Sequence, residues 1–170
     1  MVIGCKDPDD EREPGDLGRF GSGMKTASFS QARRLTVITK AKGEELSAAI
    51  WDQDRIIRDN KWNLEILSTK KIANIKNLKL SNEDESGTQI IWENLPRYSE
   101  KIDSKSPEAS KILTDDINKV KDAVSLLFHR YIKIEREDRK DITKPIKVFM
   151  NDVLIEATDP YMKNFDGHEE

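Results

Sequence analysis

Residues 17–40 read LGRFGSGMKTASFSQARRLTVITK, and this stretch decides the fold. It opens with glycines spaced G-x-x-G-x-G, at Gly18, Gly21 and Gly23. No glycine or proline follows until the end of the stretch, which predicts a short helix from about Gly23 to Ala32. Residues 34–40 are rich in apolar and β-branched side chains and predict a strand. The predicted order is therefore a glycine-rich loop, a helix and a strand.

This arrangement suits a phosphate group. Glycines let backbone amides approach an anion without a Cβ in the way, and a helix that begins there adds unpaired N–H groups and positive charge. Lys25 adds a mobile cation just inside the helix. The spacing differs from that of a P-loop because Met24 separates Gly23 from Lys25, and from the dinucleotide motif because Thr26 stands at the third glycine position. Spacing alone leaves a phosphate cradle and a purely structural loop-to-helix junction equally open.

Outside this stretch the pattern predicts more of a sheet and one long helix. Residues 6–16 (KDPDDEREPGD) are charged and contain proline, which predicts a mobile loop. Further strands are expected over 47–52, 62–69 and 87–95, the second with Trp62, Leu64 and Ile66 on its buried face, and an irregular or part-helical segment over 70–86. Apolar residues recurring at three and four predict a helix over 108–132, and a hairpin is expected over 146–157 around Asn151-Asp152.

Composition excludes several classes of function. The chain has 170 residues, the length of one domain or of one domain and the start of another. Its net charge of −3 does not support nucleic-acid binding. No run of about 18 apolar residues predicts a membrane span. A single cysteine, Cys5, and the lack of a signal-peptide pattern favour a reducing, cytoplasmic setting. Trp51, Trp62 and Trp92 are interpreted as sheet packing.

The stretch 17–40 resembles the third conserved box of the GHKL (Bergerat-fold) ATPases, with the helix and strand that follow it. It is most similar to the heat-shock chaperone of ninety kilodaltons, to MORC proteins, and to bacterial gyrase B/histidine kinase/chaperone-like ATP-binding proteins. The resemblance implies an ATP-binding hydrolase module, built as a two-layer α/β sandwich. Its sheet is expected to be mixed but mainly antiparallel, with helices on one face.

The resemblance also implies a set of nucleotide-binding residues. The box glycines and the amides of Phe20, Ser22, Gly23 and Met24 would hold the β and γ phosphates, within a lid over residues 6–23. Gly87-Thr88 looks like the fourth box, whose threonine supports the adenine-side water network. The implied set is Gly18, Phe20, Gly21, Ser22, Gly23, Met24, Lys25, Thr26 and Thr88.

Later segments resemble the end of the ATPase module. The helix ending LLFHRYI and the hairpin that leads to Asp159-Pro160-Tyr161 look like its closing segment. Residues 1–132 are therefore expected to form a partial ATP-binding domain, and 133–170 to begin a transducer-like second domain. Members of this class dimerise through their lids when ATP is bound, which makes a homodimer an implication of the resemblance.

One departure limits the expected chemistry. The family's first two boxes supply a catalytic glutamate, a magnesium-binding asparagine and an adenine-reading D-x-G-x-G, and none of these is found here. The chain thus looks like the C-terminal portion of the module with its N-terminal part missing. Mg²⁺ would belong to the intact parent, and we assign no catalytic residue and no metal ligand in this chain. ATP binding with lid closure as a conformational switch is the leading expectation. The alternative is a non-catalytic remnant that serves as a protein-interaction or dimerisation module, and hydrolysis itself stays open.

Overall fold

The computed structural model describes residues 21–99, 103, 106–132 and 145–160. Contacts divide the chain into two compact units, which part between residues 103 and 104. The first unit holds the described residues up to 103, and the second holds those from 106 onward. In this structure the long helix therefore groups with the C-terminal hairpin. The expected domain boundary at residues 132 and 133 stays a prediction.

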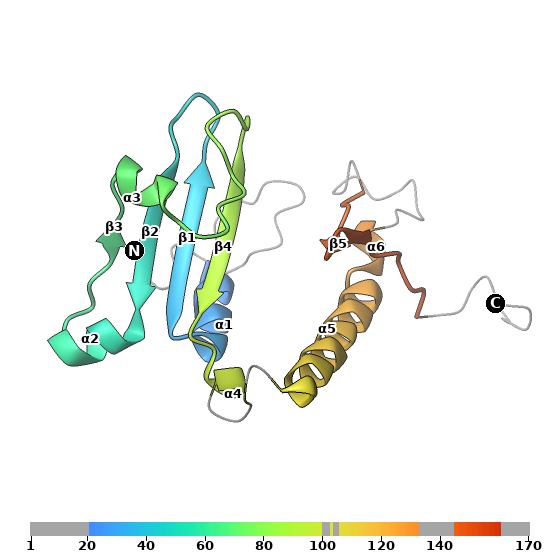
Figure 1. Cartoon of the computed structure of the whole chain (residues 1–170). Helices are drawn as coiled ribbons and strands as arrows, with labels where there is room; N and C mark the ends of the chain where they lie inside the picture. Colours follow the sequence, from blue (N-terminus) through green and yellow to red (C-terminus); the bar gives the residue numbers. More distant parts are fainter. Residues whose placement is uncertain (1–20, 100–102, 104–105, 133–144, 161–170) are drawn as a thin grey trace, which may run out of the picture. The chain divides into compact units, whose positions relative to one another are not determined.

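The first unit is built on a four-stranded sheet with the order β3-β2-β1-β4 (Figure 1). The strands are β1 (Arg34–Lys40), β2 (Ser47–Asp52), β3 (Glu65–Ile66) and β4 (Gly87–Glu93). Every pairing is antiparallel, and β1 lies between β2 and β4 with Leu35 opposite both Trp51 and Trp92. The strands predicted over 34–40, 47–52 and 87–95 are confirmed, the last ending at Glu93.

One face of this sheet is covered by α1 (Gly23–Gln31), and we name it the helix face. Because side chains alternate along a strand, it carries Leu35, Val37, Thr39, Ala49, Trp51, Thr88, Ile90 and Trp92. Trp92 Nε1 donates to Ser28 Oγ at 3.0 Å. The Phe29 ring lies 5.3 Å from that of Trp51, centroid to centroid. These contacts fix α1 against the sheet.

The opposite face, named the core face, holds the apolar core of the unit. Ile38 is fully buried there with Ala48 and Ile50, and Leu67 and Ile72 complete the cluster. Ile72 belongs to α3 (Thr69–Ala73), and the segment after it adds Ile75, Leu78 and Leu80. Full burial of one such side chain is worth about 1.5–3 kcal/mol. The predicted α/β sandwich is confirmed, and the structure adds that α3 and residues 74–80 pack on the face opposite α1.

The strand predicted over residues 62–69 is wrong in length and in its buried side. Within residues 62–69, only the two residues of β3 pair with β2. Ile66 is 78% exposed, whereas Leu67 is buried in the core. Register explains this: Ile66 lies opposite Ala49 at the uncovered edge of the helix face, so its neighbour Leu67 turns to the core face. Trp62 packs on Phe29 and Trp51 from outside the strand.

A short helix that the sequence analysis did not predict follows β2. This is α2 (Gln53–Asp59), and the carboxylate of Asp52 caps it by accepting from Arg55 N at 3.1 Å. It ends at Asn60, which has a φ of 49°. The expectation of an irregular, part-helical segment over 70–86 is confirmed, since it holds part of α3 and then turns. The first unit ends with α4 (Pro96–Ser99).

The second unit consists of a long helix and a small hairpin. The helix predicted over 108–132 is present as α5 (Pro107–Leu127), followed after Phe128 by α6 (His129–Ile132). The predicted hairpin is confirmed as β5 (Phe149–Met150) and β6 (Val153–Leu154). Its turn is made by Asn151 and Asp152, both with positive φ. Ser125 Oγ donates to Glu156 O at 2.6 Å and so ties hairpin and helix together.

Candidate functional site

The glycine-rich loop turns into α1 through a left-handed residue. Gly21 has a φ of 64°, a conformation that costs glycine little and most other residues more. Ser22 is already close to helical geometry, and α1 begins at Gly23. The residues described here therefore form a sharp loop-to-helix junction, as the glycine spacing predicted.

The first turn of α1 presents backbone amides at this junction. Thr26 N makes the first intrahelical bond, to Ser22 O at 3.0 Å, so the N–H groups of Gly23, Met24 and Lys25 precede it. The Ser22 side chain does not cap them. Apart from its own helix backbone and chain neighbours, no atom of the described residues would lie within 4 Å of a Cβ built on Gly23, so there is open space beside it. The positive end of the helix and this open space are what an anion needs.

Lys25 lies on the inner side of α1. It is 5% exposed and is one turn from the buried Ser28, which contacts Trp92 on the sheet. Met24, its neighbour, is on the outer side and is exposed. Thr26 is also exposed, and its hydroxyl donates back to Ser22 O at 3.1 Å, which holds the junction closed. Lys25 and Thr26 thus have different surroundings although they are adjacent in the sequence.

Thr88 lies on the same helix face of the sheet, near the start of β4. Its hydroxyl is 3.5 Å from that of Thr39, and its side chain is exposed. It stands four residues from Trp92, a separation of about 13 Å along a strand. The end of the face beneath α1, with Leu35 and Trp51, is buried, whereas Ile90 near Thr88 is 42% exposed. The structure therefore places Gly21–Thr26 and Thr88 on one side of the sheet, with accessible surface at the Thr88 end.

Two of the predicted binding residues, Gly18 and Phe20, lie outside the described residues, as does the expected lid up to residue 20. The described part of the set is Gly21, Ser22, Gly23, Met24, Lys25, Thr26 and Thr88.

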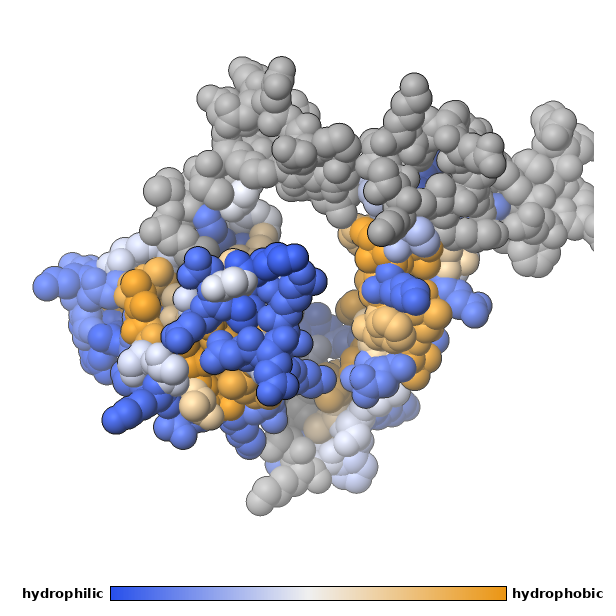
Figure 2. Space-filling model, turned by 90° about the horizontal axis from the view of Figure 1, so that it is seen from above, coloured by the Kyte–Doolittle hydropathy of each residue, from blue (hydrophilic) through white to orange (hydrophobic). Residues whose placement is uncertain are grey.

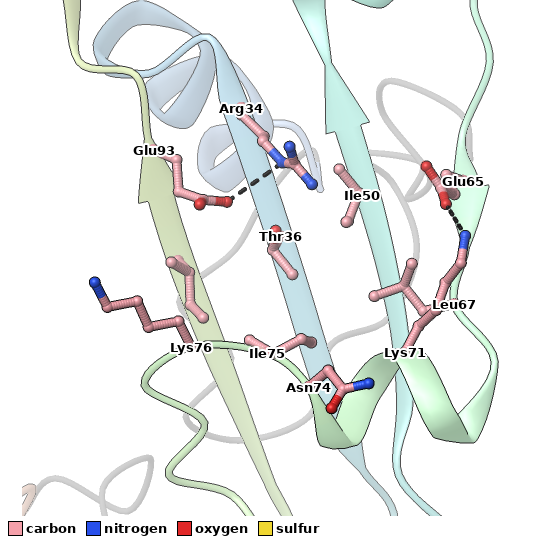
Figure 3. A pocket seen from close by; sticks show the side chains of 11 residues that line it. Arg34, Thr36, Ile50, Glu65, Leu67, Lys71, Asn74, Ile75, Lys76 and Glu93 are labelled. Atoms are coloured by element: carbon pink, nitrogen blue, oxygen red, sulfur yellow. Dashed lines mark hydrogen bonds and ion pairs between the residues drawn. The ribbon is translucent and has the colours of Figure 1, made fainter.

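A separate cavity of about 380 Å³ lies on the core face (Figure 3). Its floor includes Thr36, Ile50 and Ile91, and it contains none of the predicted binding residues. An ion pair flanks it on each side. Arg34 Nε lies 3.3 Å from a Glu93 carboxylate oxygen, without hydrogen-bond alignment, and Lys71 Nζ lies 2.7 Å from Glu65. Both carboxylates in the lining are paired with cations, and the cavity also contains Lys76.

Sequence reasoning missed this cavity because its lining comes from separate elements. Arg34 and Thr36 are on β1, Ile91 and Glu93 on β4, and Lys71 on α3. The available signal was the alternation on β1, which places Arg34 and Thr36 on the face opposite Leu35.

The carboxylate of Glu65 links β3, α2 and α3. Lys71 Nζ donates to it at 2.7 Å and Arg55 Nη1 at 2.8 Å. The hydrogen bond from Lys71, followed by the charges of Lys71 and Arg55, holds the pKa of Glu65 below its ordinary value. A carboxyl group with a lowered folded pKa stabilises the fold above its unfolded pKa of about 4.3, and this contribution is lost as the pH falls through the folded value.

Glu65→Gln is therefore expected to lower the free energy of unfolding by less than about 1 kcal/mol at neutral pH, because the group is partly exposed. The difference from the native chain should shrink between neutral pH and about pH 2, because protonation of Glu65 removes the charge that pairs with Lys71 and Arg55. Urea unfolding at the two pH values measures this, with the exposed Glu44→Gln as control. A deficit of equal size at both pH values would show that the pair does not act through charge.

The described residues offer no site for a metal ion. Within them, no group of three or more His, Cys, Asp or Glu side chains is arranged to hold one. These residues therefore supply no cluster of side-chain ligands for Mg²⁺. None of the described helices combines the length and apolar character that crossing a bilayer requires.

Comparison with known proteins agrees with this geometry. A sequence model of the family described as "Histidine kinase-, DNA gyrase B-, and HSP90-like ATPase" matches residues 1–88, which is just over half of the chain. This match includes the glycine junction, α1, the first three strands and Thr88. No curated protein and no solved structure matched the chain. On the strength of the family match, the chain belongs to the GHKL superfamily of histidine kinase-, DNA gyrase B- and HSP90-like ATPases.

Proposed function

We propose that this chain binds ATP, with the triphosphate held at the start of α1. The observation that carries the proposal is the junction at Gly21–Gly23. A left-handed glycine is followed directly by the first turn of a helix, with open space beside Gly23. The family membership indicates that the ligand of this junction is ATP, since members of the family are ATPases.

Each residue has a distinct proposed role. The amides of Ser22, Gly23 and Met24 donate to phosphate oxygens, and the ammonium group of Lys25 supplies a charge near the terminal phosphates. Thr26 keeps the junction in shape through its bond to Ser22 O. Thr88 holds the adenine end, on the same face of the sheet. Gly18 and Phe20 complete the phosphate contacts from the lid.

Lid closure is the proposed conformational switch, and a homodimer through the closed lid is its proposed output. Hydrolysis with Mg²⁺ is proposed only for a form of the protein that also carries the family's first two boxes. The proposed location of the protein is the cytoplasm. The proposal for this chain itself is binding, because the described residues supply backbone donors and a cation but no metal-ligand cluster.

Titration with a fluorescent ATP analogue tests the binding. Gly23→Val fills the open space with a side chain, and at least a tenfold rise in Kd is expected because the phosphate can no longer approach the amides. Lys25→Met keeps the buried aliphatic stem and removes the charge, and a rise of about 10- to 100-fold is expected from the loss of a charge-assisted bond. Ser30→Ala, exposed on the same helix, is the matched control.

Thermal melting of each variant separates a binding defect from a folding defect. Gly23 has negative φ and no neighbour within 4 Å of a new Cβ, so its replacement should leave the melting temperature nearly unchanged. Equal affinity of the native chain, Gly23→Val and Lys25→Met would contradict the proposal.

A non-catalytic interaction module is the second candidate. It is favoured by apolar side chains at the surface of both units, such as Ile66 and Leu127. The ATP titration discriminates the two. Binding by the native chain that is lost in Gly23→Val supports the nucleotide site, whereas no binding by any form of the chain favours the interaction module.

A further inference from the structure

We infer that α5 is a dimerisation helix, which pairs in parallel with α5 of a second copy of this chain as a short two-stranded coiled coil. The inference concerns the second unit alone. It does not depend on ATP binding or on the proposed lid dimer.

The spacing of apolar residues on α5 is that of a heptad seam. Leu113, Ile117, Val120, Val124 and Leu127 follow one another at intervals of four, three, four and three. Alternating threes and fours are the spacing of the a and d positions of a coiled coil, and the exposed Ile112, Leu126 and Phe128 lie beside this seam. Val124 and Ile117 occupy a positions, and the other three occupy d positions.

The residue types at these positions select a two-stranded, parallel assembly. β-Branched side chains at a, with leucine at d, favour parallel dimers over trimers or tetramers. Ile117 and Val124 at a, and Leu113 and Leu127 at d, follow this rule, and Val120 is the one exception at d.

The seam is at the surface of the second unit. Leu113, Val120 and Leu127 are 48%, 52% and 71% exposed, although all are apolar. The hairpin packs elsewhere on the helix, at Ser125, whose hydroxyl bonds to Glu156 O and whose carbonyl accepts from Thr158 N. Ser125 occupies the b position, which points well away from the a and d seam. Figure 2 shows apolar side chains gathered over this unit, beside charged ones.

Charges beside the seam are complementary between two parallel copies. In a parallel pair, the g residue of one helix faces the e residue of the next heptad on the other, five positions later. Asp116 is at g and Lys121 is at e, so each copy's Asp116 faces the other's Lys121. Asp116 also pairs within its own helix with Lys119 at 3.2 Å, and its side chain is 14% exposed. Like charges do not meet at any g–e contact of this register.

The first test is the molar mass of the full chain by light scattering or sedimentation, without nucleotide, over a concentration series up to about 1 mM. A monomer–dimer equilibrium is expected. Leu127→Glu should weaken it at least tenfold, because a charge then replaces a buried d side chain in both copies. Leu126→Glu changes the neighbouring exposed leucine, which is at c and off the seam, and should leave the dimer constant within about twofold.

Charge reversal tests the register. Asp116→Lys alone brings an ammonium group opposite Lys121 of the other copy and should weaken the dimer, whereas Asp116→Lys combined with Lys121→Asp should restore it. A merely structural role of Asp116 within its own helix predicts no such rescue.

Cross-linking tests the orientation. In a Cys5→Ser background, Val120→Cys should form a disulfide-linked dimer, and Asp122→Cys, on the opposite side of the helix at f, should not. Leu113→Cys and Leu127→Cys should each cross-link to themselves but not to one another when mixed. A chain that stays monomeric throughout, a dimer that survives Leu127→Glu, or cross-links between positions 113 and 127 would overturn the inference.

Discussion

Replacing Trp51 by alanine is expected to lower the free energy of unfolding of the first unit by about 3–5 kcal/mol, the largest stability effect that we predict. Trp51 is 2% exposed and is the largest buried side chain among the described residues. It lies on β2 in a cluster with Phe29 of α1 and Trp62, at centroid distances of 5.3 and 5.7 Å. Its loss leaves a cavity at the place where α1 is held to the sheet. Because domains are only marginally stable, this loss should be visible as premature unfolding in urea.

Two further variants serve as controls for the effect of Trp51→Ala. Trp62→Ala removes a half-exposed ring from the same cluster and is expected to cost about 1 kcal/mol. Trp51→Phe should recover part of the loss, because an aromatic ring still fills the site and Trp51 Nε1 has no hydrogen-bond partner within the described residues. If Trp62→Ala destabilised the unit as much as Trp51→Ala, the assignment of Trp51 to the buried layer would be wrong.

Replacing Ile155 by alanine is expected to release the hairpin from α5. Ile155 is 1% exposed and directly follows β6, and its amide donates to Val148 O at 2.8 Å. Truncation of a buried isoleucine costs about 2–5 kcal/mol. The second unit has few other buried residues among those described, so this cost is a large part of its stability.

Hydrogen exchange measures this loss directly. The amides of Ile155 and Thr158, which donate to Val148 O and Ser125 O, are expected to exchange about 30-fold faster or more in Ile155→Ala. Leu154→Ala is the matched control, because Leu154 is adjacent and 48% exposed, and it should change these rates by a few-fold at most. Equal acceleration in the two variants would show that Ile155 does not anchor the hairpin.

Much of the fold could be predicted from local patterns. The helix at Gly23, the strands at 34–40 and 47–52, and the turn at Asn151-Asp152 each have a local cause in glycine placement, β-branched residues or positive φ. The strand over 62–69 failed because alternation does not reveal how far a partner strand extends. β2 pairs with only two of its residues, and the pairing turned Leu67 rather than Ile66 toward the core. The cap at Asp52 that begins α2 was a local signal that the sequence analysis did not use.

The site was predictable in part for the same reason. Gly21–Thr26 is one local motif, and its geometry follows from its own sequence. That Thr88 shares a sheet face with α1 depends on the register between β1 and β4, which places Trp92 opposite Leu35 and Thr88 opposite Thr39. The burial of Lys25 was not predicted either, because it depends on which side of α1 meets the sheet.

The sheet order also has a consequence for how the protein behaves in concentrated solution. Among the described strands β4 is the outermost on its side, and its central residues Thr88–Trp92 carry neither charge nor proline. Natural proteins usually guard such a border with lysine, proline or a bulge, because its unpaired backbone groups can template the growth of another strand. A net charge of −3 gives only modest repulsion between molecules. On concentrating or warming, molecules should therefore associate through the outer edge of β4 and precipitate. Ile90→Lys should improve solubility.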